Sequence, residues 1–339
     1  MVGREIIAPL HGLRGIAAMT VVLGHVGDIT KVLVISPACG VLLFFSLSGY
    51  LMMHLYGAAT FSLRSAWSFA VARFARIYPL FAAVIVANVM LDIWLGKSPF
   101  QFGVDQLAPH LLLAGAGLTV WTVSVECQFY GLFLIAWIAH QTVFRKNDAA
   151  FAAFLVAGLG VLWMLGLQGG RIDILHYLHL FVLGMLAAIV MRKTGGATMV
   201  RIAGWAAIPL AASYLAICLY YAPVFAPGQR IFSEMWVSVV VAGLVGALAM
   251  APKSLAGRVL GSAPLVWLGE ISFGIYLLQR PVMFFLAAVP GLNRYTWAAL
   301  VILLTILAAW VAHLSIERPA RYWIRRGSVQ PLSIPVPTP

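Results

Sequence analysis

Two ionisable side chains share one face of the first apolar segment, residues 8–27. Arg14 and His25 are eleven residues apart there. At about 100° and 1.5 Å per residue, eleven residues make three helical turns plus about 20°, so both side chains project from one face about 16 Å apart. A guanidinium stays charged at neutral pH, whereas an imidazole exchanges a proton there. The pair predicts a cleft with a fixed cation and a deeper acid–base group. The alternative is a structural pair, with the arginine reaching the polar helix end and the histidine bonded to a neighbouring helix.

A carboxylate lies in the segment WTVSVECQFY, residues 121–130. On a helix, Glu126 shares a face with Thr122, four residues before it, and with the tyrosine four residues after it. Such a carboxylate can orient an imidazole, bind a sugar hydroxyl or pair with Arg14, and a structural ion pair between helices is the alternative. The side chains of this segment that we expect to bind substrate are Trp121, Gln128 and Tyr130.

Two arginines precede the apolar segment 78–96. Arg73 and Arg76 lie in ARFARIYPL, which hydropathy places in a cytoplasmic loop. Their i, i+3 spacing puts both guanidinium groups on one side of a short helix, and two such forks suit phosphate recognition. Binding of lipid headgroups fits the same pattern equally well.

The segment FFSLSGYLM, residues 44–52, combines small and hydroxylated side chains. Ser46, Ser48 and Gly49 permit close approach of another helix. By itself this pattern indicates helix packing.

These residues must be positioned by helices in a membrane. The chain has 339 residues, of which 63% are hydrophobic and 9% are charged, whereas a soluble domain carries roughly a quarter charged residues. Successive apolar segments are long enough to cross a bilayer as helices. The sequence therefore predicts an all-α, polytopic bundle of about ten spans. The expected spans are 8–27, 37–55, 78–96, 118–140, 150–167, 174–191, 202–221, 233–250, 265–287 and 296–315.

The distribution of basic residues predicts the orientation of the bundle. If the N-terminus is cytoplasmic, fifteen of the 22 Lys and Arg residues fall on the cytoplasmic side and five on the outer side. Cytoplasmic loops collect Lys and Arg, so both termini are expected in the cytoplasm. The same bias accounts for most of the net charge of +12 without nucleic acid as a partner.

The remaining features favour one membrane domain, residues 1–326. No cleavable signal peptide is visible, and the three cysteines lie in apolar segments rather than in a disulfide pattern. We see no metal cluster, phosphate-binding glycine loop or serine triad. The basic, aromatic RPARYWIRRG suits the membrane interface, and the proline-rich residues 327–339 are expected to be disordered.

Taken together, these segments resemble the family-3 membrane acyltransferases. The likeness rests on seven segments in sequence order along nearly the whole chain. They are LHGLRGIAAMTVVLGHV, FFSLSGYLM, RFARIYP, WTVSVECQFY, FVLGMLAA, LGEISFGIYLLQRP and IERPARYW.

The resemblance implies roles for particular residues. His25 matches the catalytic histidine, and Arg14 matches its essential partner. Arg73 and Arg76 match a cytoplasmic pair that handles the phosphates of acyl-CoA, while Glu126 matches the acidic residue of its motif. Further side chains of the matching segments that we expect to contact substrate are Ser48, Tyr50, Glu317 and Arg321.

Two positions depart from the family pattern. His11 stands where the family commonly has Asp, and Gln279 stands where it commonly has His. The first departure puts in doubt any role for an acidic group at the mouth of the first span. The second removes a further proton-transfer group.

The resemblance implies a membrane enzyme of the bacterial inner membrane. It would move an acyl group, most simply acetyl, from cytoplasmic acyl-CoA to a sugar hydroxyl of an exported polysaccharide or glycolipid. His25 would act as general base or as a transient acyl carrier. Some relatives carry an extra extracellular hydrolase-like domain, for which we see no room here, so the acyl group would go directly to the acceptor or to a separate partner.

Other readings stay open. A secondary transporter also carries charged midplane residues, although it usually shows a repeat with broken helices, which we do not find. An acyltransferase acting on a small glycosylated natural product is a second alternative. Expected partners are membrane lipids, the acyl-CoA co-substrate and the glycan acceptor, with a second copy of the chain or polysaccharide-assembly proteins as further candidates.

Overall fold

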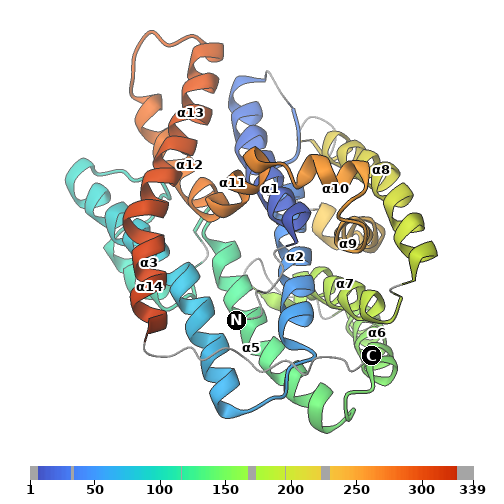
Figure 1. The fold of residues 1–339 in the computed structure, drawn as a ribbon. Helices are drawn as coiled ribbons and strands as arrows, with labels where there is room; N and C mark the ends of the chain where they lie inside the picture. Colours follow the sequence, from blue (N-terminus) through green and yellow to red (C-terminus); the bar gives the residue numbers. More distant parts are fainter. Residues whose placement is uncertain are drawn as a thin grey trace.

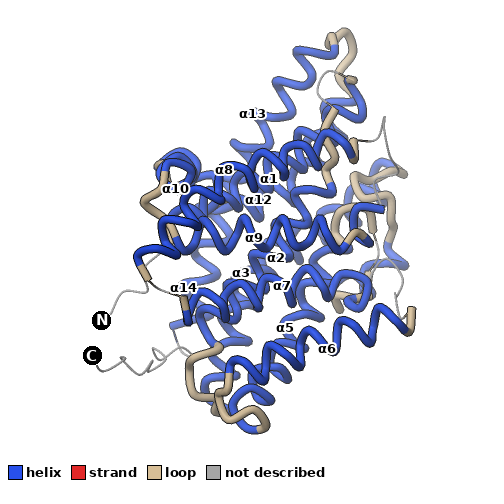
Figure 2. Tube along the Cα trace, turned by 90° about the vertical axis from the view of Figure 1, so that its right-hand side faces the viewer, coloured by secondary structure: helices blue, strands red, loops and turns tan. Residues whose placement is uncertain are grey.

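The computed structural model describes residues 7–31, 34–115, 117–166, 173–194, 196–222 and 230–326. These residues form helices joined by short connections, without a strand among them (Figure 1). Figure 2 shows the long helices running side by side across the molecule, with the connecting loops gathered toward its two ends. The helices are α1 (Ala8–Thr30), α2 (Ala38–Tyr56), α3 (Leu63–Leu95), α4 (Leu107–Leu111), α5 (Trp121–Thr142), α6 (Asp148–Met164), α7 (Ile174–Lys193), α8 (Ala197–Tyr220), α9 (Met235–Met250), α10 (Leu255–Leu260), α11 (Ala263–Glu270), α12 (Ser272–Ala287), α13 (Arg294–Ala312) and α14 (Arg318–Arg326).

The all-helical, membrane-embedded class is confirmed. Six helical runs in the described part of the chain are long and apolar enough to cross a bilayer, namely α2, α3, α5, α7, α8 and the run 294–326. Three shorter helices, α6, α9 and α12, are also apolar. Each of the ten expected ranges overlaps a helix of at least 16 residues. The number of helices that cross the membrane and the side on which the termini lie stay predictions.

Two helix boundaries within the bundle differ from those expected. Helix α3 begins at Leu63, so the cytoplasmic loop expected around Arg73 and Arg76 is wrong and both arginines lie within a 33-residue helix. A reciprocal Ser62–Ser65 capping box stabilises its start. The expected span 265–287 is broken at Ile271 into α11 and α12.

The end of the helical region also differs. Helix α13 continues through a π-helical turn, His313–Glu317, into α14. The prediction that residues 327–339 are disordered falls outside the described residues.

Two close contacts between helices depend on glycine residues. A Cβ atom at Gly49 of α2 would lie 2.0 Å from the backbone oxygen of Phe181 on α7. A Cβ at Gly269 of α11 would lie 1.9 Å from the backbone oxygen of His11 on α1. Both distances are far below van der Waals contact, so these pairs approach at backbone distance. The packing role expected for Gly49 of α2 is confirmed.

The two described ends of the chain lie on the same side of the bundle. His11 near the start of α1 and Arg326 at the end of α14 border one cavity. We call this side of the bundle the basic side. The opposite side, where α1 ends at Thr30 and α3 ends at Leu95, is called the far side.

Candidate functional site

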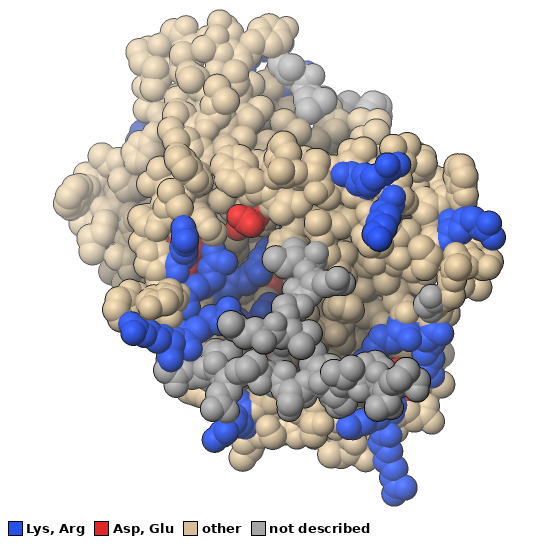
Figure 3. All heavy atoms as spheres, viewed as in Figure 1, with Lys and Arg blue, Asp and Glu red and all other residues tan. Residues whose placement is uncertain are grey.

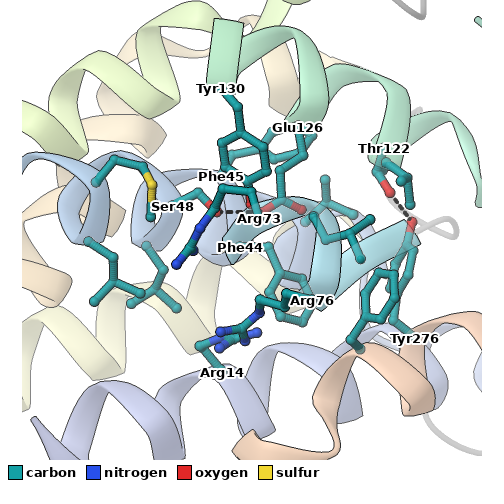
Figure 4. Close-up of a pocket in the computed structure, with 17 residues that line it drawn as sticks. Arg14, Phe44, Phe45, Ser48, Arg73, Arg76, Thr122, Glu126, Tyr130 and Tyr276 are labelled. Carbon is teal, nitrogen blue, oxygen red and sulfur yellow. Dashed lines mark hydrogen bonds between the residues drawn. The ribbon is translucent and has the colours of Figure 1, made fainter. Parts of the chain in front are cut away.

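A narrow chamber lies among α1, α2, α3, α5 and α12 (Figure 4). Its cavity volume is about 60 Å³, so it is a slot rather than an open cleft. The walls are mainly apolar, with aromatic rings from α2 and α12. The polar and charged side chains that line it are Arg14, Ser48, Arg73, Arg76, Thr122, Glu126, Tyr130 and Tyr276.

Glu126 is held in the chamber by two hydroxyl groups. The Ser48 hydroxyl donates to Glu126 Oε1 at 2.9 Å, and the Tyr130 hydroxyl donates to the same oxygen at 2.5 Å. Tyr130 lies one helical turn after Glu126, as the i, i+4 spacing predicts. One carboxylate oxygen thus accepts two hydrogen bonds, one from α2 and one from its own helix, α5.

Three guanidinium groups line the same chamber from other helices. Figure 4 shows Arg14 and Arg76 side by side at one end of the chamber, with Arg73 between them and Glu126. The Arg73 guanidinium carbon lies 6.0 Å from the centroid of the Tyr130 ring. Glu126 is the one carboxylate among the residues described as lining the chamber, so an excess of positive charge remains. The chamber is therefore suited to a ligand that carries or develops negative charge.

The chamber continues into a wide basic cavity, which we call the vestibule. The vestibule has a volume of about 670 Å³, and Arg14 and Arg76 line both spaces. Figure 3 shows Lys and Arg side chains around a hollow on this face, with an acidic side chain at its edge. The other ionisable side chains that line the vestibule are His11, Glu270, His313, Arg318, Arg321, Arg325 and Arg326, with Tyr322 among them.

Arg321 is positioned in the vestibule by Glu317. Its Nη2 donates to Glu317 Oε2 at 3.1 Å and its Nε donates to the Glu317 backbone oxygen at 3.2 Å. Glu317 itself is buried and does not line the vestibule. Of these two expected substrate contacts, only Arg321 faces the open space.

His25 is oriented by the residue that departs from the family pattern. The Gln279 amide nitrogen donates to the Tyr276 backbone oxygen at 3.0 Å, so the amide oxygen faces His25 Nδ1 at 3.2 Å. A backbone oxygen can only accept and an amide oxygen can only accept, so His25 Nδ1 carries the proton. The imidazole Nε2 is then the unprotonated nitrogen and can act as a base.

Arg14 and His25 both contact α12, as their shared face on α1 predicts. Arg14 Nη2 donates to the Ser272 hydroxyl at 3.4 Å, and His25 contacts Gln279, two turns further along α12. Tyr276 lies between these two contacts on α12 and packs edge-on against Phe44 at 6.0 Å. Arg14 opens onto the chamber, whereas His25 is not among its lining residues.

Three expected substrate contacts lie outside the chamber. The Tyr50 hydroxyl donates to Met191 Sδ at 3.3 Å. The Trp121 ring packs 5.0 Å from that of Tyr177, and Gln128 Oε1 accepts from the Ile174 backbone N–H at the start of α7. Each of these contacts joins helices.

The sequence reasoning assigned no role to α12, which contributes three polar contacts at the site. They come from Ser272, Tyr276 and Gln279. The Tyr276 hydroxyl accepts from Thr122 at 2.8 Å and donates to the Thr119 backbone oxygen at 2.7 Å, which ties α12 to α5. The available signal was the segment LGEISFGIYLLQRP, in which all three lie.

Apolar helices that enclose a charged chamber and an oriented histidine define an integral membrane protein with a buried polar site. Residues 7–314 match the model of the family described as "Acyltransferase domain". The chain therefore belongs to this acyltransferase family, and the resemblance found in the sequence is confirmed.

Two curated relatives are similar to the chain. It is 24% identical to peptidoglycan O-acetyltransferase OatA of Listeria monocytogenes over 366 residues, which cover 94% of this chain and 56% of the relative. It is 32% identical to the putative peptidoglycan O-acetyltransferase YrhL of Bacillus subtilis over 114 residues, which cover 33% of this chain and 18% of the relative. The chain thus spans about half the length of the first relative. No solved structure matches significantly.

Proposed function

We propose that the chain is a membrane O-acetyltransferase that moves an acetyl group from acetyl-CoA to a sugar hydroxyl of a surface glycan. One observation carries the proposal: a cation-lined vestibule continues, through Arg14 and Arg76, into a chamber beside the helix pair that holds His25. A wide basic entrance suits a polyphosphate headgroup, and a narrow slot suits a slender acyl-bearing arm.

The donor is proposed to enter from the basic side. Its phosphates bind in the vestibule to Arg76, Arg321 and Arg14, and its pantetheine arm occupies the chamber. Arg73 lines the chamber but not the vestibule, so we place it beside the arm and the thioester. The sequence reasoning had paired it with Arg76 as a phosphate ligand. To reach His25, the arm must pass the Phe44–Tyr276 ring pair.

The proposed reaction needs one base and aligned reactants, because a thioester is already activated. His25 Nε2 takes the proton of the acceptor hydroxyl, and the hydroxyl oxygen attacks the thioester carbonyl carbon. The carbon–sulfur bond breaks, and the thiolate takes the Nε2 proton of the His25 imidazolium as CoA leaves, which restores the neutral base. A two-step route, in which His25 Nε2 first carries the acetyl group, uses the same geometry.

The acceptor class is supported by the names of the two relatives, both of which refer to peptidoglycan. We propose a glycan hydroxyl at the membrane surface. Cell-wall glycan, exported polysaccharide and lipopolysaccharide all carry such hydroxyl groups and would be acetylated at the inner membrane. A small glycosylated natural product is the alternative acceptor. Purified full chain is incubated with labelled acetyl-CoA and each class of acceptor, and the label is located.

A donor-site variant tests the proposed path. Arg76→Ala is expected to raise the KM for acetyl-CoA about tenfold or more, because it removes a charge-assisted contact to the donor phosphates. The matched control is Arg201→Ala, which removes an exposed arginine that lines neither cavity. Equal KM values for Arg76→Ala and wild type contradict phosphate binding there. Substrate uptake into vesicles without acetyl-CoA consumption would favour a transporter.

A positioning variant tests the orientation of His25. Gln279→Leu is expected to lower kcat about tenfold with little change in the KM for acetyl-CoA, because the imidazole loses the side-chain contact that orients it across the α1–α12 interface. Gln279→His restores a ring nitrogen that accepts the Nδ1 proton and is expected to retain most activity. Equal losses in both variants, or a loss confined to KM, argue against an orienting role.

A further inference from the structure

A second cavity lies on the far side, above the His25–Gln279 pair. It has a volume of about 560 Å³ and is bordered by the end of α1, the end of α3, the loop after α3 and the outer part of α12. No residue lines both this cavity and the vestibule. The residues that line it are Ile29, Asp92, Gly96, Lys97, Ser98, Pro99, Gln101, Arg280, Met283 and Phe284.

The helical spacing places His25 next to this far-side cavity. Ile29 lies four residues after His25 on α1, and Met283 lies four residues after Gln279 on α12. Residues four apart lie on one helix face about 6 Å apart along the axis. On both helices, therefore, a residue of the cavity lining lies one turn beyond the hydrogen-bonded pair. The far-side cavity is nearer to His25 than is Arg14, which lies about 16 Å along the same helix.

The loop that borders this cavity is held in a defined conformation. Buried Asn88 donates to the Phe102 backbone oxygen at 3.0 Å and accepts from the Phe100 backbone N–H at 3.0 Å. The Ser98 hydroxyl donates to the Phe102 oxygen as well, at 3.2 Å. Gln101 adopts a left-handed conformation with φ of 59°, which costs energy in a residue with a side chain. These hydrogen bonds fix the loop, and the loop in turn holds Lys97 and Gln101 at the edge of the cavity.

The lining combines the groups that recognise a charged sugar. Lys97 and Arg280 supply two cations and Asp92 one carboxylate among the lining residues described. A second carboxylate, Asp28 on α1, lies near Arg280 outside the lining. The Lys97 ammonium lies 6.0 Å from the centroid of the Phe284 ring. An aromatic face can pack against the apolar face of a sugar ring, while the cations bind an acidic substituent and Asp92 and Gln101 bind hydroxyl groups.

We propose that the far-side cavity is the acceptor site, and that it binds a saccharide unit bearing a carboxylate. This inference rests on the proposed function, since it names the acceptor class of the same reaction. Lys97 and Arg280 bind the carboxylate, Phe284 packs against the ring, and a hydroxyl of the unit points down between α1 and α12 toward His25 Nε2. The donor and the acceptor then approach the histidine from opposite ends of α1.

Paired variants and paired acceptors test this site in the purified full chain. The acceptors are a uronic-acid oligosaccharide and its methyl ester, which lacks the charge. Lys97→Gln is expected to raise the KM for the acid about tenfold, with the KM for acetyl-CoA unchanged. With the ester, wild type and Lys97→Gln are expected to have equal KM values, because the group that Lys97 binds is gone.

Two further substitutions on the far side serve as controls. Lys31→Gln removes an exposed lysine outside the cavity lining, and it is expected to leave the KM for the acid unchanged. Phe284→Ala is expected to raise the KM for both acceptors, whereas Phe285→Ala, at the neighbouring ring outside the lining, is not. The proposal is overturned if Lys97→Gln and Lys31→Gln change the KM for the acid equally, or if Phe284→Ala and Phe285→Ala change the acceptor KM values equally.

Binding without donor separates this inference from the proposed function. The melting temperature of the detergent-solubilised chain is measured with the uronic-acid oligosaccharide alone. Stabilisation that Lys97→Gln removes and Lys31→Gln keeps supports the site even if no acetyl transfer occurs, in which case only the proposed function fails. Transfer of acetyl to the acid with a KM that Lys97→Gln leaves unchanged overturns the acceptor site and leaves the proposed function standing.

Discussion

Replacing His25 with alanine is expected to lower kcat for acetyl transfer by about 10²- to 10⁴-fold, the usual contribution of a positioned general base. The structure gives the reason: Gln279 holds the Nδ1 proton, which leaves Nε2 as the basic nitrogen of the ring. The vestibule and chamber do not include His25, so the Kd for acetyl-CoA is expected to stay within about twofold of the wild-type value, because no donor contact is lost.

The measurement is steady-state transfer together with equilibrium binding of labelled acetyl-CoA. His176→Ala is a suitable control, since it removes a histidine that lines neither the chamber, the vestibule nor the far-side cavity. Substantial transfer by His25→Ala rules out a central role for this histidine. Labelled acetyl retained on acid-denatured wild type but not on His25→Ala would select the two-step route through an acyl-histidine.

Replacing Glu126 with glutamine is expected to lower kcat/KM about 100-fold and to reduce stability by about 1–3 kcal/mol, because two hydrogen bonds to a charged group become neutral. The substitution keeps the shape of the side chain and an oxygen that accepts from Ser48 and Tyr130. It removes the negative charge that offsets Arg14, Arg73 and Arg76 in the chamber. Three guanidinium groups then share a narrow, mostly apolar space without a carboxylate, so both folding and donor placement suffer.

A double variant separates charge balance from a chemical role of Glu126. If charge balance sets stability, Arg73→Met in the Glu126→Gln background lowers the melting temperature by less than the sum of the two single effects. Glu234→Gln, at a carboxylate outside the chamber, is expected to be neutral. Additive effects in the double variant, or a wild-type melting temperature for Glu126→Gln, contradict the proposed charge balance.

The predictions that depend on one helix alone agree with the structure. The eleven-residue spacing of Arg14 and His25 places both on the face of α1 that meets α12, because helical rotation per residue is nearly constant. The i, i+4 spacing of Glu126 and Tyr130 likewise brings the two side chains into contact. Apolar segment lengths predict the helices for the same local reason.

Predictions that depend on where helices begin were less accurate. Hydropathy separates apolar from polar residues, so it placed Arg73 and Arg76 in a loop before the third span. The helix nevertheless extends back to Leu63, where Ser62 and Ser65 cap it. Within a membrane bundle, a charged residue can stay helical when it faces a polar cavity, and both arginines line the chamber.

Sequence alone determined the helical class, the membrane setting, the acyltransferase family and the shared face of Arg14 and His25, because these follow from composition, local spacing and motifs. Tertiary structure decided that Gln279 orients His25, that Glu126 shares a chamber with three arginines, and that separate cavities lie at the two ends of α1. The His25–Gln279 contact, for example, joins residues 254 positions apart. These arrangements depend on which helices pack together, and no local pattern in the chain encodes that choice.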